Sequence, residues 1–195
     1  MKTSVNLAIF ASGNGSNAEN IVKYFTPSDT IIVDSIFTNN VDAYVLERAN
    51  RLDIPSFYFN NTDFRKGDSI LEILHARHID YIILAGFLLK ISSNLIMAYP
   101  QKIINIHPAL LPKYGGKGMY GDNVHRAVKE ADESKSGISI HLVNEHYDDG
   151  AIIFQAQCKL EPSDTVSQIA AKVHKLEYQY FPIAIEDYIN KQNYS

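Results

Sequence analysis

The fold is decided by an apolar run that passes straight into a short polar loop, VNLAIF-ASGNGSN at residues 5–17. Residues 5–10 have the composition of a strand, and residues 17–25 have the apolar spacing of a helix. A loop with two glycines, residues 12–17, joins them. The stretch therefore predicts a strand–loop–helix unit that begins an α/β fold.

Strand-like and helix-like segments alternate along most of the remaining chain. Further strands are expected at residues 30–37, 56–58, 81–84, 102–106, 138–143 and 151–157, and further helices at 43–52, 64–76, 92–98, 123–130 and 165–188. Pro182 is expected to break or kink the last helix. Because strands alternate with helices, we expect a mostly parallel, twisted, Rossmann-like sheet with helices on both faces. The last two strands, which follow each other around a turn, predict an antiparallel addition near the C-terminus.

Length and composition indicate one soluble domain over residues 1–195. The chain has 195 residues, 46% of them hydrophobic and 21% charged, and a net charge of -4. This charge argues against a general nucleic-acid binder, which is usually basic, but leaves room for a local phosphate pocket. We find no apolar run of membrane-spanning length and no signal peptide, and the single Cys158 has no disulfide partner. We expect a cytoplasmic protein, a monomer or weak homodimer.

Asn105 and His107 stand two residues apart at the end of an expected strand, ahead of Pro108 and Pro112. On an extended backbone, residues i and i+2 point to the same side, so the amide and the imidazole can face one atom. The prolines restrict the backbone that follows. Such a pair could polarise a carbonyl group. Taken alone, the stretch fits equally a strand end with a hydrogen-bonded histidine before a proline turn.

The loop at residues 12–17 follows the first expected strand and opens the first expected helix. Glycines allow a close approach of the backbone to a ligand, and a helix start presents free N–H groups to an anion. A phosphate monoester would fit there. The loop lacks the Gly-Lys-Ser/Thr ending of a Walker loop and the third glycine of a dinucleotide fingerprint. The alternative is a structural turn in which Ser16 or Asn17 caps the helix.

The turn at residues 147–150 carries an acidic pair, Asp148 and Asp149, before Gly150. Asp-Asp-Gly is ordinary turn chemistry. In the expected sheet, however, this turn projects toward the same edge as His107. A carboxylate beside an imidazole raises the imidazole's pKa. We expect Asp148 to be that partner, and His146 and Asp149 to be solvated.

Together these motifs resemble the phosphoribosylglycinamide formyltransferase family, folate-dependent enzymes of purine synthesis. The resemblance covers residues 7–182, and its motifs are SGNGSN at 12–17, LAGF at 84–87, NIHP at 105–108, LLP at 110–112, SIH at 139–141 and DDG at 148–150. The Asn-x-His-Pro element is shared by several formyltetrahydrofolate enzymes. The glycine loop narrows the resemblance to this family or to its relative, the formyltetrahydrofolate deformylase.

The resemblance implies transfer of a formyl group from 10-formyltetrahydrofolate to the amine of glycinamide ribonucleotide. His107 would donate a hydrogen bond to the oxyanion, Asn105 would support it, and Asp148 would raise the pKa of His107 and order a water. The reaction needs no metal, because the formyl group is already activated on the folate nitrogen. His75 and His78 lie at a spacing that could bind a metal, but they lack a third ligand nearby.

The resemblance also assigns binding residues. The ribonucleotide phosphate would be bound by Gly15, Ser16 and Asn17, with Glu177 near the ribonucleotide. The folate would contact Leu88, Leu89, Lys90, Ile91, Asn105, Asn144 and Tyr147. A solvated helix face remains the alternative for Glu177. His141 is either a pocket-wall residue or a packed core histidine, and His174, Arg65 and Lys66 are weaker candidates.

Residues 113–121 depart from the family pattern. Four glycines there suggest a mobile lid over the substrates.

Two other functions stay open. A deformylase, which delivers the formyl group to water, would normally carry an extra N-terminal domain, for which we expect no room before residue 5. A non-catalytic binder of folate or phosphoribosyl metabolites would not need the Asn105, His107 and Asp148 trio.

Overall fold

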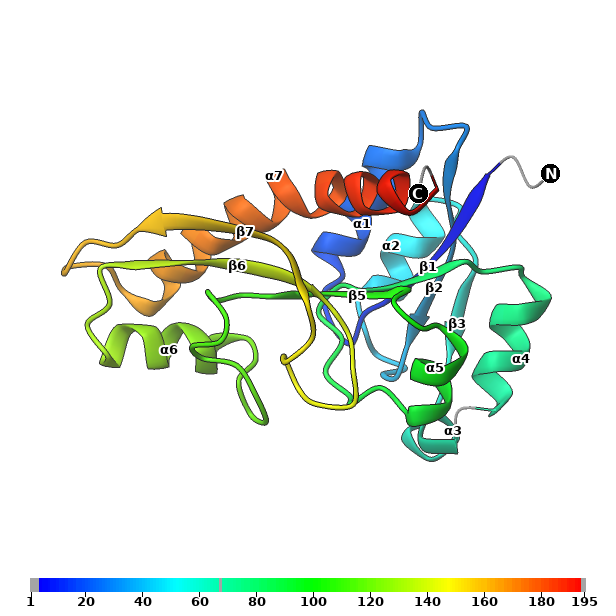
Figure 1. Cartoon of the computed structure of the whole chain (residues 1–195), viewed down its shortest axis with the longest axis horizontal. Coiled ribbons are helices and arrows are strands. Elements are labelled where there is room, and N and C mark those ends of the chain that lie inside the picture. The colour runs from blue at the N-terminus through cyan, green and yellow to red at the C-terminus, as the bar shows by residue number, and fades with distance from the viewer. Residues whose placement is uncertain (1–3, 67, 194–195) are drawn as a thin grey trace. The chain divides into compact units, whose positions relative to one another are not determined.

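The computed structural model describes residues 4–66 and 68–193, and the chain forms two compact units, Met1–Ile104 (unit 1) and Asn105–Ser195 (unit 2). Unit 1 contains β1 (Val5–Phe10), α1 (Ser16–Phe25), β2 (Ile31–Thr38), α2 (Val45–Arg51), β3 (Ser56–Tyr58), α3 (Asn61–Lys66), α4 (Asp68–Ala76), β4 (Tyr81–Leu84) and α5 (Ser93–Ala98). Strand β5 (Ile103–His107) crosses the boundary between the units. Unit 2 continues with α6 (Asp122–Glu130), β6 (Lys135–Leu142), β7 (Ile152–Lys159) and α7 (Val166–Asn193) (Figure 1).

The strands form a seven-stranded sheet in the order β3-β2-β1-β4-β5-β6-β7. Within unit 1, β1 pairs in parallel with both β2 and β4, and β2 pairs in parallel with β3. Within unit 2, β6 and β7 run side by side in antiparallel directions (Figure 1). The expected mostly parallel α/β sheet with an antiparallel addition is therefore confirmed.

The core of unit 1 forms because its strands carry continuous apolar runs, as strands covered on both faces must. All four residues of β4 are buried. Aromatic rings fill the space beside β1, where Phe10 stacks on Phe37 with centroids 4.9 Å apart. Phe59 and Phe64 stack at 5.0 Å in the same cluster. Each such ring removes a large apolar area from water, so this cluster is a main source of the unit's stability.

In unit 2 the long helix α7 packs against β6, β7 and α6. Strand β7 alternates between more and less exposed residues, as expected for an antiparallel strand with one solvated face. The two strands approach so closely at Gly137 that a Cβ there would lie 2.0 Å from the carbonyl oxygen of Ala156. Only glycine fits at this position without a shift of the backbone.

Two expected helices differ in detail from the structure. Helix α7 continues through Pro182 to Asn193, so of the expected break or kink at Pro182 the break is wrong, and the kink stays a prediction. Phe181 and Ile185, on either side of the proline, are fully buried, and this packing outweighs the one backbone hydrogen bond that proline removes. The helix expected at residues 64–76 is observed as α3 and α4, on either side of residue 67, which lies outside the described residues.

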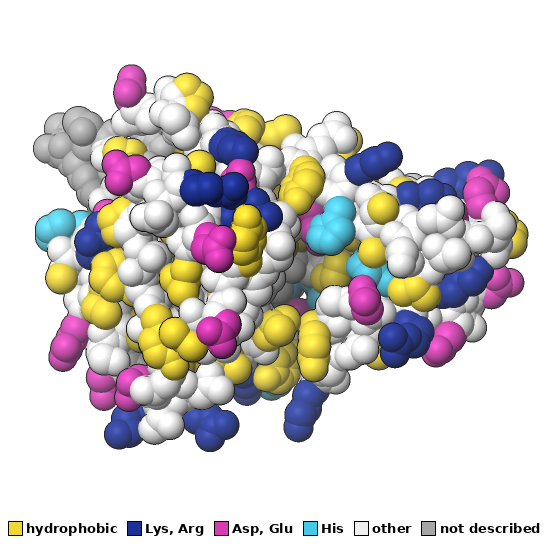
Figure 2. Space-filling view, turned by 180° about the vertical axis from the view of Figure 1, so that it is seen from behind, with side chains coloured by type: hydrophobic (Ala, Val, Ile, Leu, Met, Phe, Trp, Pro, Cys, Tyr) yellow, Lys and Arg dark blue, Asp and Glu magenta, His cyan; other side chains and the backbone are white. Residues whose placement is uncertain are grey.

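No helix in the described ranges is both long and apolar enough to cross a membrane. On the face drawn in Figure 2, acidic and basic side chains are interspersed. The extent of a single domain over residues 1–195 stays a prediction.

Replacement of Phe10 by Ala should lower the free energy of unfolding by about 3–5 kcal/mol, the cost of emptying a well-packed core site. Phe10 is fully buried among aromatic rings, whereas Val41 is 62% exposed. Urea unfolding of Phe10→Ala and of the control Val41→Ala measures the difference, and the control should stay within about 0.5 kcal/mol of wild type. Equal unfolding free energies for the two variants would contradict the assignment of this core.

Candidate active site

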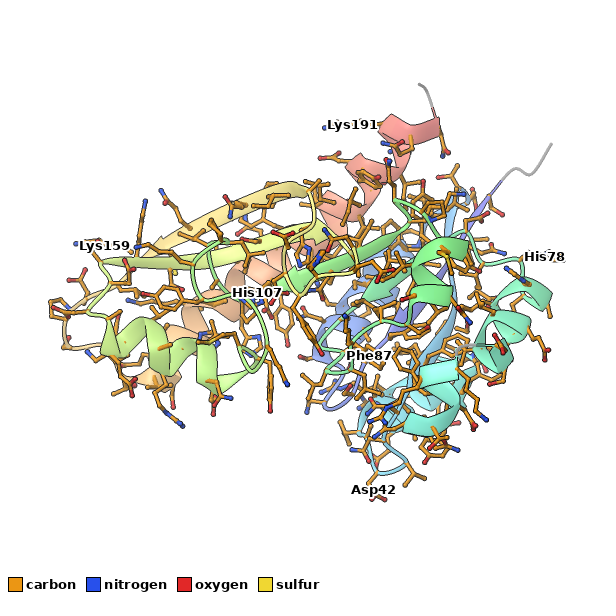
Figure 3. All side chains as sticks on the ribbon, turned by 60° about the horizontal axis from the view of Figure 1, so that its bottom comes forward. Asp42, His78, Phe87, His107, Lys159 and Lys191 are labelled. Carbon is orange, nitrogen blue, oxygen red and sulfur yellow. The ribbon has the colours of Figure 1, made fainter. Side chains whose placement is uncertain are left out.

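His107 ends β5 as a buried side chain, 3% exposed. Its Nε2–H donates a hydrogen bond of 2.7 Å to the backbone carbonyl of Tyr114. Because a carbonyl can only accept, the neutral ring must carry its proton on Nε2. Its Nδ1 then presents a lone pair and lies 3.5 Å from Asp148 Oδ2. The proton that His107 gains or loses is therefore the one on Nδ1. Figure 3 labels His107 among the strands and helices of unit 2.

Asp148 is held by the turn between β6 and β7 in a left-handed conformation, with φ at +53°. The backbone N–H of Gly116 donates to its Oδ2 at 2.9 Å, and its Oδ1 lies 3.6 Å from His141 Nε2. The turn needs glycine at Gly150, where a Cβ would lie 1.7 Å from the carbonyl oxygen of Leu142. The expected turn chemistry of this Asp-Asp-Gly segment thus serves to place one carboxylate beside two imidazoles.

Asn105 joins the same cluster through His141. The Nδ1–H of His141 donates to the carbonyl of Leu142 at 2.9 Å, so its Nε2 accepts from the Nδ2–H of Asn105 at 3.0 Å. Among the described residues, the second Asn105 N–H and the side-chain carbonyl oxygen have no partner. The structure therefore brings Asn105, His107 and Asp148 together, as expected, with His141 between Asn105 and Asp148.

Asp148 raises the pKa of His107, as expected, but burial has the larger effect. Burial lowers the pKa of His107 below its ordinary value, and the carboxylate of Asp148 and the carbonyl of Tyr114 oppose this without reversing it. The ring is therefore neutral at pH 7. The unfolded chain takes up a proton near pH 6.5 that folded His107 resists, so this residue costs stability as the pH falls below about 6.5.

Asp148 shows the opposite balance. Burial acts to raise the pKa of Asp148, but the contact with His141, the positive charge of His107 once its ring is protonated, and the Gly116 N–H together hold it below its ordinary value. The carboxylate is therefore ionised at neutral pH. It lies opposite the Nδ1 position at which His107 would acquire positive charge.

In unit 1 the glycine loop begins α1 without a side-chain cap from the described residues, because the residue at the N-cap is Gly15 with φ at +72°. The alternative in which Ser16 or Asn17 caps the helix is therefore wrong. The first helical hydrogen bond runs from Glu19 N–H to the Gly15 carbonyl, so the N–H groups before Glu19 are not used by the helix itself. This is the arrangement that binds anions at helix starts.

Helix α2 holds this loop in place. The guanidinium of Arg48 donates to the backbone carbonyl and to the side-chain oxygen of Asn14, both at 2.8 Å, and also pairs with Glu19. A Cβ at Gly15 would lie 2.3 Å from the side chain of Val45. The loop is therefore a fixed element whose glycine is required by packing as well as by its backbone angle.

Ser12 links the loop to the segment expected to contact folate. Its Oγ donates to Asn39 Oδ1 at 2.6 Å and accepts from the N–H of Leu88 at 3.0 Å. The Leu88 N–H is thus already used within unit 1. The folate contacts expected at Leu89, Lys90 and Ile91 stay a prediction. Leu88 is itself 52% exposed, and Ile91 is buried.

Glu177 on α7 is buried, 5% exposed, so the alternative of a solvated helix face is wrong. Its Oε2 accepts a 2.8 Å hydrogen bond from Nδ1 of His174, and this bond raises the pKa of His174. The charge of Glu177 also acts on two buried histidines, His107 and His125. Glu177 therefore belongs to the electrostatic surroundings of His107.

The remaining expected residues lie on exposed or half-buried loops or, for Arg65 and Lys66, on helix α3. Asn144 accepts a 2.8 Å hydrogen bond from the His146 N–H, and Tyr147 is 44% exposed. His146 and Asp149 are exposed, as expected, and so are Arg65 and Lys66. Within residues 4–66 and 68–193, no group of three or more His, Cys, Asp or Glu side chains is placed to hold a metal ion. The lid expected at residues 113–121 stays a prediction.

Sequence reasoning missed two residues and undervalued a third. Tyr114 acts through its backbone carbonyl, for which no side-chain signal exists. His125 was overlooked, although its place beside Val124 and Val128 on an amphipathic helix points to burial, which lowers its pKa. His141, which was left open between two roles, links Asn105 to Asp148. The spacing of Ser139 and His141 on one strand face was the available signal.

Comparison with known proteins points to one family. A sequence model of the formyl transferase family matches residues 5–185. The phosphoribosylglycinamide formyltransferase of Haemophilus influenzae is 34% identical over 92% of this chain and 85% of its own length. The enzyme of the same name from Bacillus subtilis is 36% identical, with 95% of both chains covered. The chloroplastic relative of Arabidopsis thaliana is 36% identical over 90% of this chain, which spans 62% of that relative's length.

Solved structures agree with these relatives. The phosphoribosylglycinamide formyltransferase of Streptococcus pneumoniae superimposes with a TM-score of 0.84 at 32% identity, covering 95% of this chain and 99% of that one. That of Bacillus halodurans gives a TM-score of 0.86 at 29% identity, covering 96% of each chain.

Replacement of Asp148 by Asn should lower the pKa of His107 further. The change removes the negative charge that now raises this pKa and leaves the burial that lowers it. NMR titration of the histidine ring signals measures the shift. Asp149→Asn, which removes an exposed charge from the neighbouring position, is the matched control and should leave the titration of His107 unchanged. A higher pKa for His107 in Asp148→Asn would refute the pairing.

Proposed function

We propose that this chain, which belongs to the phosphoribosylglycinamide formyltransferase family, transfers the formyl group of 10-formyltetrahydrofolate to the amine of phosphoribosylglycinamide. The products are the formylated ribonucleotide and tetrahydrofolate, in the synthesis of purines. One observation carries the proposal beyond family membership. A buried neutral imidazole, an amide and an ionised carboxylate meet within one cluster. Together these groups can accept a proton and stabilise an oxyanion, as acyl transfer requires.

His107 acts at Nδ1. The ribonucleotide amine attacks the formyl carbon, the new C–N bond forms, and the carbonyl electron pair moves onto oxygen. Nδ1 of neutral His107 accepts the proton that the amine loses, directly or through a water. The resulting Nδ1–H donates to the oxyanion, and Asp148 stabilises the imidazolium. When the oxyanion re-forms the carbonyl, the C–N10 bond breaks and its electron pair goes to folate N10. N10 takes up the proton that Nδ1 of His107 releases, directly or through a water, and the ring returns to neutral.

Asn105 supports the oxyanion through its amide, because its contact with His141 fixes the orientation of the side chain. His141 is a positioning residue in this scheme. It is itself held by the carbonyl of Leu142, so the amide is preorganised before the substrate arrives.

The ribonucleotide phosphate binds the loop of Gly15, Ser16 and Asn17, and Glu177 contacts the ribonucleotide. Support for the first assignment comes from the uncapped start of α1 and from the rigid support given by Arg48. The folate co-substrate contacts the backbone of Leu89, Lys90 and Ile91, together with Leu88, Asn105, Asn144 and Tyr147. We also propose a cytoplasmic location and a monomer or weak homodimer. Size-exclusion chromatography with light scattering tests the oligomeric state.

The proposed reaction is tested with purified protein and 10-formyltetrahydrofolate, with and without phosphoribosylglycinamide, by following tetrahydrofolate and formate. Tetrahydrofolate should appear only with the ribonucleotide and without formate. Release of formate in the absence of the ribonucleotide would assign the chain to the deformylases instead.

Replacement of His107 by Ala should lower kcat by about 10²–10⁴-fold, the usual contribution of a general acid–base group, with little change in the KM for the ribonucleotide. His146→Ala, at an exposed loop histidine, is the matched control and should keep wild-type kcat. Steady-state kinetics measure both. A normal kcat combined with a raised ribonucleotide KM in His107→Ala would show that the role is binding.

Replacement of Asn17 by Ala should raise the KM for the ribonucleotide by about 10–100-fold, the loss expected for a hydrogen bond to a charged group. The KM for the folate co-substrate in the same variant serves as the internal control and should stay unchanged. A selective rise in the folate KM would show that the phosphate binds elsewhere.

A further inference from the structure

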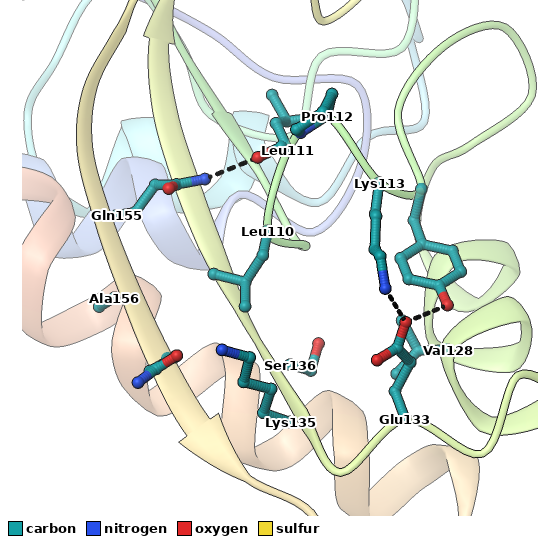
Figure 4. Close-up of a pocket in the computed structure, with 12 residues that line it drawn as sticks. Leu110, Leu111, Pro112, Lys113, Val128, Glu133, Lys135, Ser136, Gln155 and Ala156 are labelled. Atoms are coloured by element: carbon teal, nitrogen blue, oxygen red, sulfur yellow. Dashed lines mark hydrogen bonds and ion pairs between the residues drawn. The ribbon is translucent and has the colours of Figure 1, made fainter.

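A pocket of about 420 Å³ lies in unit 2 against the segment that holds His107 (Figure 4). Leu110, Val128 and Ala156 are among the apolar residues that line it, and none of the catalytic cluster of Asn105, His107, His141 and Asp148 lines it. Its wall includes Tyr114, whose carbonyl binds His107, and Glu133, in the connection between α6 and β6. The two residues that support His107, Tyr114 and Glu133, therefore line a pocket that is separate from the catalytic cluster.

Glu133 anchors this segment with one oxygen. Its Oε1 accepts a hydrogen bond of 2.8 Å from the Tyr114 hydroxyl and one of 2.7 Å from the Lys113 ammonium (Figure 4). The Lys113 and Tyr114 hydrogen bonds lower the pKa of Glu133, so its carboxylate is ionised at neutral pH. The Lys113 side chain is 69% exposed and its ion pair is screened by water, so the hydroxyl contact is the more effective anchor.

Tyr114 requires such an anchor because its backbone is in the left-handed region, with φ at +57°. This conformation costs a non-glycine residue roughly 1 kcal/mol or more, and it persists only when surrounding contacts enforce it. The ring packs against the buried cluster of Val128, Leu160 and Ile169. Glu133 holds the far end of the ring, and the carbonyl of the same residue holds His107.

We propose that Glu133 is a positioning residue for formyl transfer, which acts on His107 through Tyr114. By fixing the hydroxyl end of Tyr114, it keeps the carbonyl aimed at His107 Nε2. The ring is then held with its proton on Nε2 and with Nδ1 free to take the amine proton. This inference rests on the proposed function for its kinetic consequence, but its structural consequence exists without substrate.

The test compares Glu133→Ala with Glu133→Gln, Tyr114→Phe and the control Glu130→Ala. Glu133→Ala and Tyr114→Phe both remove the hydroxyl anchor and should lower kcat about tenfold, the size of one hydrogen bond, with each KM within about twofold. Glu133→Gln retains an oxygen that accepts from the Tyr114 hydroxyl and should restore most of kcat. Glu130, exposed at the end of α6, should be replaceable without effect.

Two readouts separate positioning from a loss of structure. The double variant Glu133→Ala/Tyr114→Phe should be no slower than either single variant, because both changes break the same hydrogen bond, from the Tyr114 hydroxyl to Glu133. In the absence of substrate, the nitrogen NMR signals of His107 should move away from a pure Nε2–H tautomer in Glu133→Ala and not in Glu130→Ala. These signals remain informative if the wild-type protein transfers no formyl group, so the two proposals can fail separately.

Wild-type kcat and unchanged His107 signals in Glu133→Ala would overturn the inference. Full additivity of the two single effects in the double variant would also overturn it. A kcat for Glu133→Gln as low as that for Glu133→Ala would overturn it as well, because Glu133→Gln loses only the ion pair with Lys113 and keeps an acceptor for the Tyr114 hydroxyl.

Discussion

The hydrogen bond from His107 Nε2–H to the Tyr114 carbonyl is the interaction on which the rest of the candidate site depends. It fixes the tautomer and leaves Nδ1 to face Asp148. Burial then keeps the ring neutral, while the carboxylate opposite Nδ1 reduces the cost of protonating it. A group that is neutral at rest and stabilised once charged has the properties of a base that acts during the reaction.

This arrangement is built from conformations that are unfavourable by themselves. Tyr114 and Asp148 both have positive φ, and they are the residues that contact the two nitrogens of His107. Each is held by neighbours: Tyr114 by Glu133, and Asp148 by the N–H of Gly116. Local strain of this kind at a candidate site, compensated by surrounding contacts, is typical of functional positions. The stability of unit 2 thus maintains the geometry of one imidazole.

The sequence predicted the strands well where the apolar runs are continuous. Both β1 and β4 begin and end where expected, and the trio of Asn105, His107 and Asp148 meets as the resemblance implied. The sequence predicted that Asp148 raises the pKa of His107, but the larger opposing effect of burial depends on the whole fold and cannot be read from neighbouring residues. The contacts of His141 and of the Tyr114 carbonyl also depend on the whole fold, and the unbroken helix through Pro182 was missed because packing overrides local preference.

The tautomer of His107 in the wild-type protein tests this account most directly. Nitrogen-15 NMR of the imidazole at pH 7 distinguishes a protonated ring nitrogen from a bare one. We predict a neutral ring with the proton on Nε2 and a bare Nδ1. A proton on Nδ1 with a bare Nε2, or a fully protonated imidazolium at pH 7, would contradict it.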